Sequence, residues 1–133
     1  MKSLLTVGAM VAASIGLMAS PALASPAAGA RTIASCKAQG EYAICDAAGT
    51  ARHHPVTIVL HVRAYPRQSV QGAWSIVCSR GFSAGSSSGQ FNGGTPINRT
   101  LHHPYRHPDS CIVSADGQLS HGGHLHLWLT YRS

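Results

Sequence analysis

The sequence predicts an all-β domain, namely a small disulfide-stapled β-sandwich of immunoglobulin-like architecture preceded by a signal peptide. Several segments alternate apolar and polar residues with the period of two that is typical of strands with one buried face. Clusters of Gly, Pro, Ser and Asp separate these segments. After residue 24, no segment combines a 3.6-residue apolar repeat with helix caps at both ends. Short strands separated by turn clusters favour a sandwich or a barrel.

Residues 1–24 have the features of a signal peptide: Lys2 at the positive end, an apolar stretch over 4–18 and a small-residue cleavage site at 22–24. We therefore expect a secreted, extracellular protein. No later apolar run approaches the roughly 20 residues that cross a bilayer, so we expect no transmembrane segment in the mature protein. The predicted organisation is a signal peptide (1–24), a flexible N-terminal segment (25–34) and a single β domain (35–133).

The four cysteines, Cys36, Cys45, Cys78 and Cys111, are expected to form two disulfides in an oxidising compartment. Residues 36–45 predict a hairpin with a two-residue turn at Gly40 and Glu41. Counting outward from that turn, Cys36 faces Cys45 at a non-hydrogen-bonded position, where Cα atoms are about 4.5 Å apart and within disulfide range. We therefore expect a Cys36–Cys45 disulfide and, by elimination, a Cys78–Cys111 disulfide.

Two central segments predict strands with one buried face. Residues 56–64 alternate strictly until Pro66 ends the run, and residues 70–78 place Trp74 and Cys78 on the same inward face. The Trp lies four residues before a cysteine rather than midway between two, which departs from the pattern of antibody domains. "Immunoglobulin-like" therefore describes the architecture alone. The inward residues of the first segment are Val56, Ile58, Leu60, Val62 and Ala64.

Residues 81–94 are rich in Gly and Ser, and we expect a long loop there, or a loop around a short edge strand, with Phe82 and Phe91 as its only large apolar anchors. After it we expect a strand over 97–101, a loop over 102–109, a short strand over 111–115 and a turn at Asp116-Gly117. The last strand alternates clearly. Its apolar face holds Leu125, Leu127, Leu129 and Tyr131, and its other face holds His124, His126, Trp128 and Thr130.

The chain is basic, with 10 Lys and Arg against 4 Asp and Glu. Lys2 belongs to the predicted signal peptide, so the mature chain keeps nine cationic against four acidic residues, an excess of five. Such a balance favours anionic partners. We expect a non-catalytic binding or cell-envelope-associated protein whose ligand is an anionic envelope polymer or another acidic molecule. The cations form no run, so we expect no sequence-specific nucleic-acid binding.

All nine histidines lie beyond the predicted signal peptide, which suggests a metal-binding alternative. His124 and His126 project from one strand face, and imidazole suits zinc and copper. His121, across the Gly122-Gly123 bend, completes the predicted zinc or copper site. The competing interpretation is a set of exposed polar positions that happen to hold histidine. The third ligand could instead come from the loop histidine His102, His103 or His107, if that loop folds back.

A small secreted ribonuclease is a further alternative, because histidine and arginine can perform acid-base cleavage of RNA. No pair of these residues lies in a recognisable catalytic context. Residues 85–89 match the G-x-S-x-G motif, which requires a strand-turn-helix setting in a much larger sheet. We therefore expect no enzymatic activity and assign no catalytic residue.

The segment with Cys36 and Cys45, the strand over 74–78 and the glycine-rich 81–94 segment leading to Cys111 resemble those of small secreted actinobacterial proteins of unknown function. The resemblance spans most of residues 35–131. It implies a disulfide-stapled β domain without an assigned site.

Secreted subtilisin-inhibitor proteins are also similar in size, charge and number of disulfides, which adds protease inhibition as an alternative. The Met-containing reactive loop expected of that family has no clear counterpart in residues 101–109.

Overall fold

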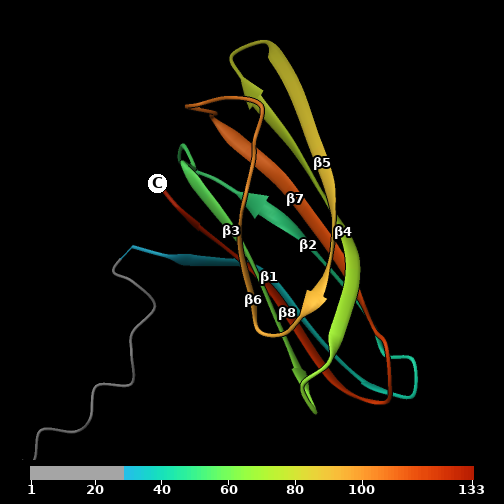
Figure 1. Ribbon diagram of the computed structural model, residues 1–133. Coiled ribbons are helices and arrows are strands. Elements are labelled where there is room, and N and C mark those ends of the chain that lie inside the picture. The colour runs from blue at the N-terminus through green and yellow to red at the C-terminus, as the bar shows by residue number, and fades with distance from the viewer. Residues whose placement is uncertain (1–28) are drawn as a thin grey trace, which may run out of the picture.

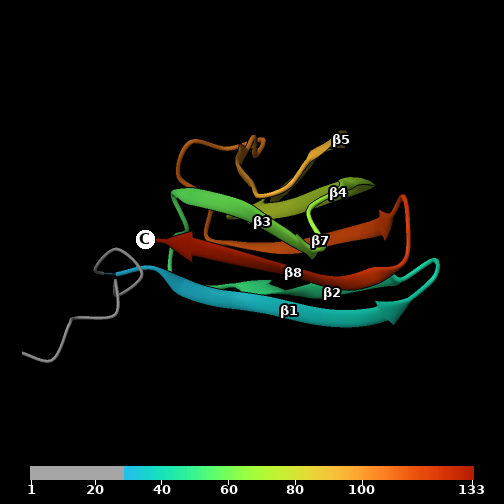
Figure 2. The same ribbon diagram turned by 60° about the horizontal axis from the view of Figure 1, so that its bottom comes forward.

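The computed structural model describes residues 29–133, which form two four-stranded antiparallel sheets packed face to face (Figures 1 and 2). This confirms the predicted all-β sandwich. The predicted signal peptide lies outside the described residues. Within residues 29–133, no helix is long and apolar enough to cross a membrane. The strands are β1 (Arg31–Gly40), β2 (Ile44–Ala51), β3 (Thr57–Tyr65), β4 (Ser69–Arg80), β5 (Ser83–Gly94), β6 (Ile97–Leu101), β7 (Ser110–Leu119) and β8 (Gly123–Arg132).

The strand order is β1-β8-β3-β6 in one sheet and β2-β7-β4-β5 in the other. Only β4 and β5 are consecutive in the chain and paired in one sheet; every other connection crosses to the opposite sheet. Figure 2 shows the C-terminus beside the start of β1, in agreement with the pairing of Arg31 with Tyr131. The first and last strands of the domain are therefore hydrogen-bonded neighbours, with β1 at the edge of the β1-β8-β3-β6 sheet.

The core lies between the sheets and consists of alternate residues from nearly every strand, as the period-two pattern predicts. Trp74 and Cys78 are 7% and 1% exposed, which confirms their inward orientation. Val56 was expected to face inward with its neighbours, but it precedes β3 and is 44% exposed. The largest fully buried aliphatic side chains are Ile58, Leu60, Val62, Val70, Ile76, Val113, Leu119, Leu125, Leu127 and Leu129.

Both expected disulfides are present, but the hairpin that predicted the first one is wrong. β1 pairs with β8 and β2 pairs with β7, so the Cys36–Cys45 disulfide joins the two sheets, with Cα atoms 5.8 Å apart. The Cys78–Cys111 disulfide joins directly opposed residues of β4 and β7 within one sheet, with Cα atoms 4.0 Å apart. The first disulfide was predicted despite the wrong pairing because the short β1–β2 connection brings Cys36 and Cys45 close together even though the two strands belong to different sheets.

Residues 83–94 form a 12-residue edge strand, β5, in place of the expected long loop or short edge strand. β5 pairs with β4 along its whole length without an irregularity. A glycine is required at residue 89 of β5 because the Trp74 ring lies against it: a Cβ on Gly89 would lie 2.7 Å from this ring. Gly72 on β4 leaves similar room for Phe91, at 2.5 Å. Glycine here accommodates an aromatic partner across the strand instead of ending the strand.

β7 continues through Asp116 and Gly117, where a turn was expected. Both residues pair with β2 and with β4. The Asp116 Oδ1 accepts a hydrogen bond from the Ala73 N–H at 2.8 Å. A Cβ on Gly117 would lie 3.2 Å from Leu127, so the glycine is explained by the close approach of the opposite sheet. The turn follows Leu119 instead.

Two further expectations about chain segments are corrected. β1 begins at Arg31, so residues 31–34 belong to the domain rather than to a flexible segment. An irregularity between Thr32 and Ala34 hides the alternation that would have predicted this extension. Phe82 lies in the β4–β5 turn with its side chain fully exposed, and therefore anchors nothing, whereas Phe91 is buried as expected.

Candidate functional site

Charge is unevenly divided between the two sheets. All four acidic residues of the chain lie off the β1-β8-β3-β6 sheet: Glu41, Asp46, Asp109 and Asp116 are in connections or in β2 and β7. The strands of the β1-β8-β3-β6 sheet carry five cations. This sheet therefore carries no carboxylate on its strands. Three of its cations lie on its outer face, whereas Arg31 and Arg99 oppose the inward residues Tyr131 and Leu60. Its cations are Arg31, Lys37, Arg63, Arg99 and Arg132.

The outer face of this sheet is built from the polar positions of the last strand, as predicted. Leu125, Leu127 and Leu129 are buried, so the alternate residues of β8 face outward. The register places Lys37 and Arg63 on either side of His126. In the neighbouring row, Trp128 lies beside His61, which in turn lies beside Asn98 of β6. Four strands thus contribute to one continuous face.

The centre of this face is an aromatic and cationic group that we call the Trp128 cluster: Trp128, His61, His126 and Arg63. The ring centroids of His61 and Trp128 are 4.9 Å apart, with an interplanar angle of 9°. Those of His126 and Trp128 are 4.4 Å apart, at 25°. The Arg63 Cζ lies 5.5 Å from the Trp128 ring, within cation–π range. The four side chains therefore support one another.

His61 is held by both of its ring nitrogens. Its Nδ1 is 2.7 Å from Asn98 Oδ1, and its Nε2 is 2.9 Å from Thr130 Oγ1. Since an amide oxygen can only accept, the Nδ1–H donates to Asn98 Oδ1, and the Thr130 hydroxyl is the partner of Nε2. These contacts fix the orientation of the ring against which Trp128 stacks.

Two grooves flank the Trp128 cluster, and Arg63 lines both. One has a volume of about 680 Å³ and is lined by Lys37, Gln39, Tyr65 and His124 among others. The other has a volume of about 500 Å³ and includes Asn98, Trp128, Thr130 and Arg132 in its lining. Together they follow β3 and β8 from one end of the pairing to the other. At about 3.3 Å per residue, nine paired residues span roughly 30 Å.

The pKa of His126 is lowered from its ordinary value, first by burial and then by the positive charges of Lys37 and Arg63. The imidazole is therefore neutral at neutral pH. A bound anion would offset both neighbouring cations and favour the protonated ring.

The predicted metal ligands do not form one cluster. His124 and His126 lie two residues apart on the outer face of β8, and His126 stacks on Trp128. His121 lies in the β7–β8 connection, where its backbone N–H donates to Gln68 Oε1 at 2.7 Å. Within residues 29–133, no group of three or more His, Cys, Asp or Glu is arranged to hold a metal ion. Zinc or copper binding by these residues stays a prediction.

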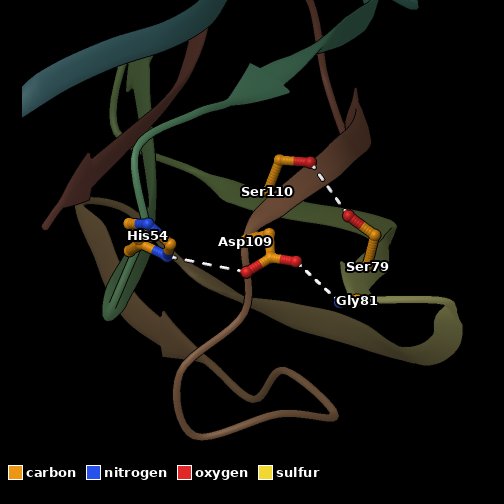
Figure 3. A network of polar contacts seen from close by, with 5 residues as sticks. All are labelled: His54, Ser79, Gly81, Asp109 and Ser110. Atoms are coloured by element: carbon orange, nitrogen blue, oxygen red, sulfur yellow. Dashed lines mark hydrogen bonds and ion pairs between the residues drawn. The ribbon is translucent and has the colours of Figure 1, made fainter.

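A second polar group lies at one end of the sandwich and is centred on Asp109, which the sequence did not single out (Figure 3). Its Oδ2 accepts the Gly81 N–H at 2.7 Å, and its Oδ1 lies 3.7 Å from His54 Nδ1. The Ser79 and Ser110 hydroxyls bond each other at 3.1 Å. Figure 3 shows Asp109 between His54 and Gly81, with the two serines directed to each other. This network ties three connections together and does not place a serine on the imidazole, as a catalytic triad requires.

The loop residues His102 and His103 and the serine-rich motif have structural contacts. His103 Nε2 lies 2.6 Å from the Val56 carbonyl oxygen, to which it donates. The Ser87 hydroxyl donates to the His102 carbonyl. Residues 85–89 lie within β5 and are paired with β4, so the G-x-S-x-G match is part of a strand ladder.

No protein family, curated protein or solved structure matches the chain in sequence or fold comparisons. Function is therefore inferred from the geometry of the Trp128 cluster and its flanking grooves.

Proposed function

We propose that the protein is a non-catalytic binding module that holds an anionic polymer against the outer face of the β1-β8-β3-β6 sheet. The observation that carries this proposal is the separation of charge: three cations, Lys37, Arg63 and Arg132, lie on the outer face of this sheet, and all four acidic residues of the chain lie off its strands. An anion approaching this face meets no carboxylate on its strands. The two disulfides favour an oxidising, extracellular setting, where envelope polymers are the ligand class that we propose.

The spacing of the cations suits an extended ligand. Lys37 and Arg63 are separated by one strand, so their Cα atoms are about 10 Å apart across β8. Arg132 lies further along the same strand pair, in the second groove. A polymer lying along β8 would pass between Lys37 and Arg63 and then meet Arg132. Repeated weak contacts of this kind give useful affinity only to a ligand with many charges.

The contacts within the Trp128 cluster favour binding over proton transfer. Both ring nitrogens of His61 are used by Asn98 and Thr130. His126 is stacked on Trp128, and its pKa is lowered. A surface fixed in this way loses little conformational freedom when a ligand binds.

The proposal is tested by comparing two double variants that remove the same charge. Lys37→Gln with Arg63→Gln removes two cations from the proposed face, whereas Arg52→Gln with Arg80→Gln removes two exposed cations outside the β1-β8-β3-β6 sheet. Binding of long-chain inorganic polyphosphate is measured by fluorescence anisotropy.

Each exposed charge contact contributes about 0.2–1 kcal/mol. We therefore expect the first variant to bind about 2- to 30-fold more weakly. The control is expected to change affinity by less than about twofold. Added salt should weaken wild-type binding. Equal losses in the two variants would show that net charge alone attracts the polymer and would contradict the proposed face.

A further inference from the structure

The two sheets have four edge strands, and three of them carry features that oppose pairing with another chain. β1 has an irregularity between Thr32 and Ala34 and carries Lys37. β6 has only 5 residues and includes Arg99. β2 carries Asp46. Charged residues, short length and bulges are the usual means by which sheet edges are protected.

β5 has none of these features. It has 12 residues, contains no charged residue and no proline, and pairs with β4 in one unbroken register. Its exposed edge is therefore long and regular, and its own residues carry no charge. By the rules that govern sheet edges, such a strand is a template for a further strand.

The register shows which backbone groups of β5 point away from β4. The two strands are joined by the two-residue turn Gly81-Phe82, so the turn-flanking pair Arg80 and Ser83 is hydrogen-bonded and such pairs then alternate. The odd-numbered residues of β5 consequently bond β4, and the even-numbered residues between 84 and 92 direct their N–H and C=O groups outward. All of these even-numbered residues are exposed.

Within residues 29–133, one of these outward groups has a recorded partner: the Gln90 carbonyl accepts a hydrogen bond from Arg99 Nη1 at 3.2 Å. This contact agrees with the assignment of even-numbered residues to the free edge. Ser86 and Ser88, in the middle of the strand, keep their outward N–H and C=O groups free among the described residues.

We propose that this edge pairs antiparallel with β5 of a second copy of the chain, which extends the β2-β7-β4-β5 sheet across a two-fold axis. Twofold symmetry is the commonest way in which identical chains associate. It places residue i of one copy opposite residue j of the other and residue j opposite residue i, so that residues near the axis meet their own counterparts. Like charges at such an interface would repel each other, and β5 is the edge strand that carries none. The strand itself thus adds no like-charge repulsion, and the cation found at its edge is Arg99 of β6, which bonds the Gln90 carbonyl.

The arrangement has a consequence for binding. A two-fold axis perpendicular to the extended sheet keeps the inner faces of both copies on the same side. The two β1-β8-β3-β6 sheets then also lie on one side, with their cationic outer faces directed the same way. This consequence rests on the proposed function, since two such faces would bind one long anionic polymer more tightly than either face alone. The β5 pairing itself does not depend on the ligand.

The test compares Ser88→Pro with the control Ser88→Ala in the purified, oxidised chain. Proline at residue 88 removes an outward N–H and spares the ladder to β4, whereas alanine keeps the N–H. Analytical ultracentrifugation is expected to show a monomer–dimer equilibrium for the wild-type chain and for Ser88→Ala, and a monomer for Ser88→Pro. A wild-type chain that is monomeric at every concentration, or a Ser88→Pro dimer as stable as the wild type, would overturn the proposal.

Amide hydrogen exchange of the wild-type chain gives a readout that needs no variant. The N–H groups of Ser86 and Ser88 are expected to be protected at high protein concentration and to lose protection on dilution. Those of Ser87 and Gly89 should stay protected throughout, because they bond β4. Rapid exchange at Ser86 and Ser88 at every concentration would contradict strand pairing, even if the chain associates through another surface. None of these outcomes depends on polyphosphate binding.

Discussion

Replacing Gly89 by alanine tests the assignment of residues 83–94 to strand β5, which their glycine and serine content did not predict. A Cβ at this position would lie 2.7 Å from Cζ2 of Trp74 and 2.8 Å from Cε2 and Nε1. Carbon atoms do not approach so closely, and the Trp74 ring is 7% exposed and enclosed by the core. Either the ring or the β5 backbone must therefore move. Overpacking of this kind costs about 1–3 kcal/mol of folding free energy.

Gly93 provides a matched control on the same strand. A Cβ at Gly93 would have no atom within 4 Å. Gly93→Ala should therefore leave stability unchanged or raise it by about 0.4–1 kcal/mol, because alanine restricts the unfolded chain. The two variants are then expected to differ by about 1–4 kcal/mol, the sum of the two effects.

Thermal unfolding of the oxidised chain, followed by tryptophan fluorescence, measures this difference. For a domain of about 100 residues, 1 kcal/mol shifts the Tm by about 4–8 °C. Gly89→Ala should consequently melt about 4–24 °C below the wild type, and Gly93→Ala at or slightly above it. Equal melting temperatures for the two variants would refute the packing of Trp74 over Gly89 and, with it, the assignment of residues 83–94 to a strand.

Two further predictions concern pH and the disulfides. Because the pKa of His126 is lowered by burial and by two neighbouring cations, the native state binds fewer protons here than the unfolded state below about pH 6.5. The free energy of unfolding should therefore fall as the pH drops from 6.5 toward the native pKa of His126. In urea denaturation at a series of pH values, His126→Gln should remove this part of the fall. A variant with the same pH profile as the wild type would contradict the prediction. The disulfides close chain segments with separations of 9 and 33 residues. The loop-entropy relation gives a stabilisation of about 2.6 kcal/mol for Cys36–Cys45 and about 3.7 kcal/mol for Cys78–Cys111. Replacing Cys78 and Cys111 by alanine should therefore lower the free energy of unfolding by about 1 kcal/mol more than replacing Cys36 and Cys45. A larger loss for the Cys36–Cys45 pair would be inconsistent with this mechanism.

Much of the fold could be predicted because two strands alternate without interruption. β3 and β8 follow the period of two along most of their length, and their inward residues form the centre of the core. β5 could not be predicted because its strand character depends on β4: Trp74 and the backbone of β4 provide the packing and hydrogen bonds that its own Gly and Ser residues do not favour. Local propensity was overridden by tertiary context.

The candidate site was predicted in part for the same reason. The outward positions of His126 and Trp128 follow from the alternation of β8 alone. The position of Arg63 beside His126 depends on the register between β3 and β8, two strands far apart in the chain. The separation of charge likewise depends on which strands share a sheet. Neither can be obtained from spacing along the sequence.

The measurement that tests the proposed binding face most directly is an NMR titration of the oxidised chain with long-chain inorganic polyphosphate. We expect the largest shifts at Lys37, at Arg63 and at the indole N–H of Trp128, with saturation at a defined ratio of ligand to protein and weakening in added salt. Shifts centred instead on the loop cations Arg52 and Arg106, or spread evenly over both sheets, would contradict the assignment of anion binding to the outer face of the β1-β8-β3-β6 sheet.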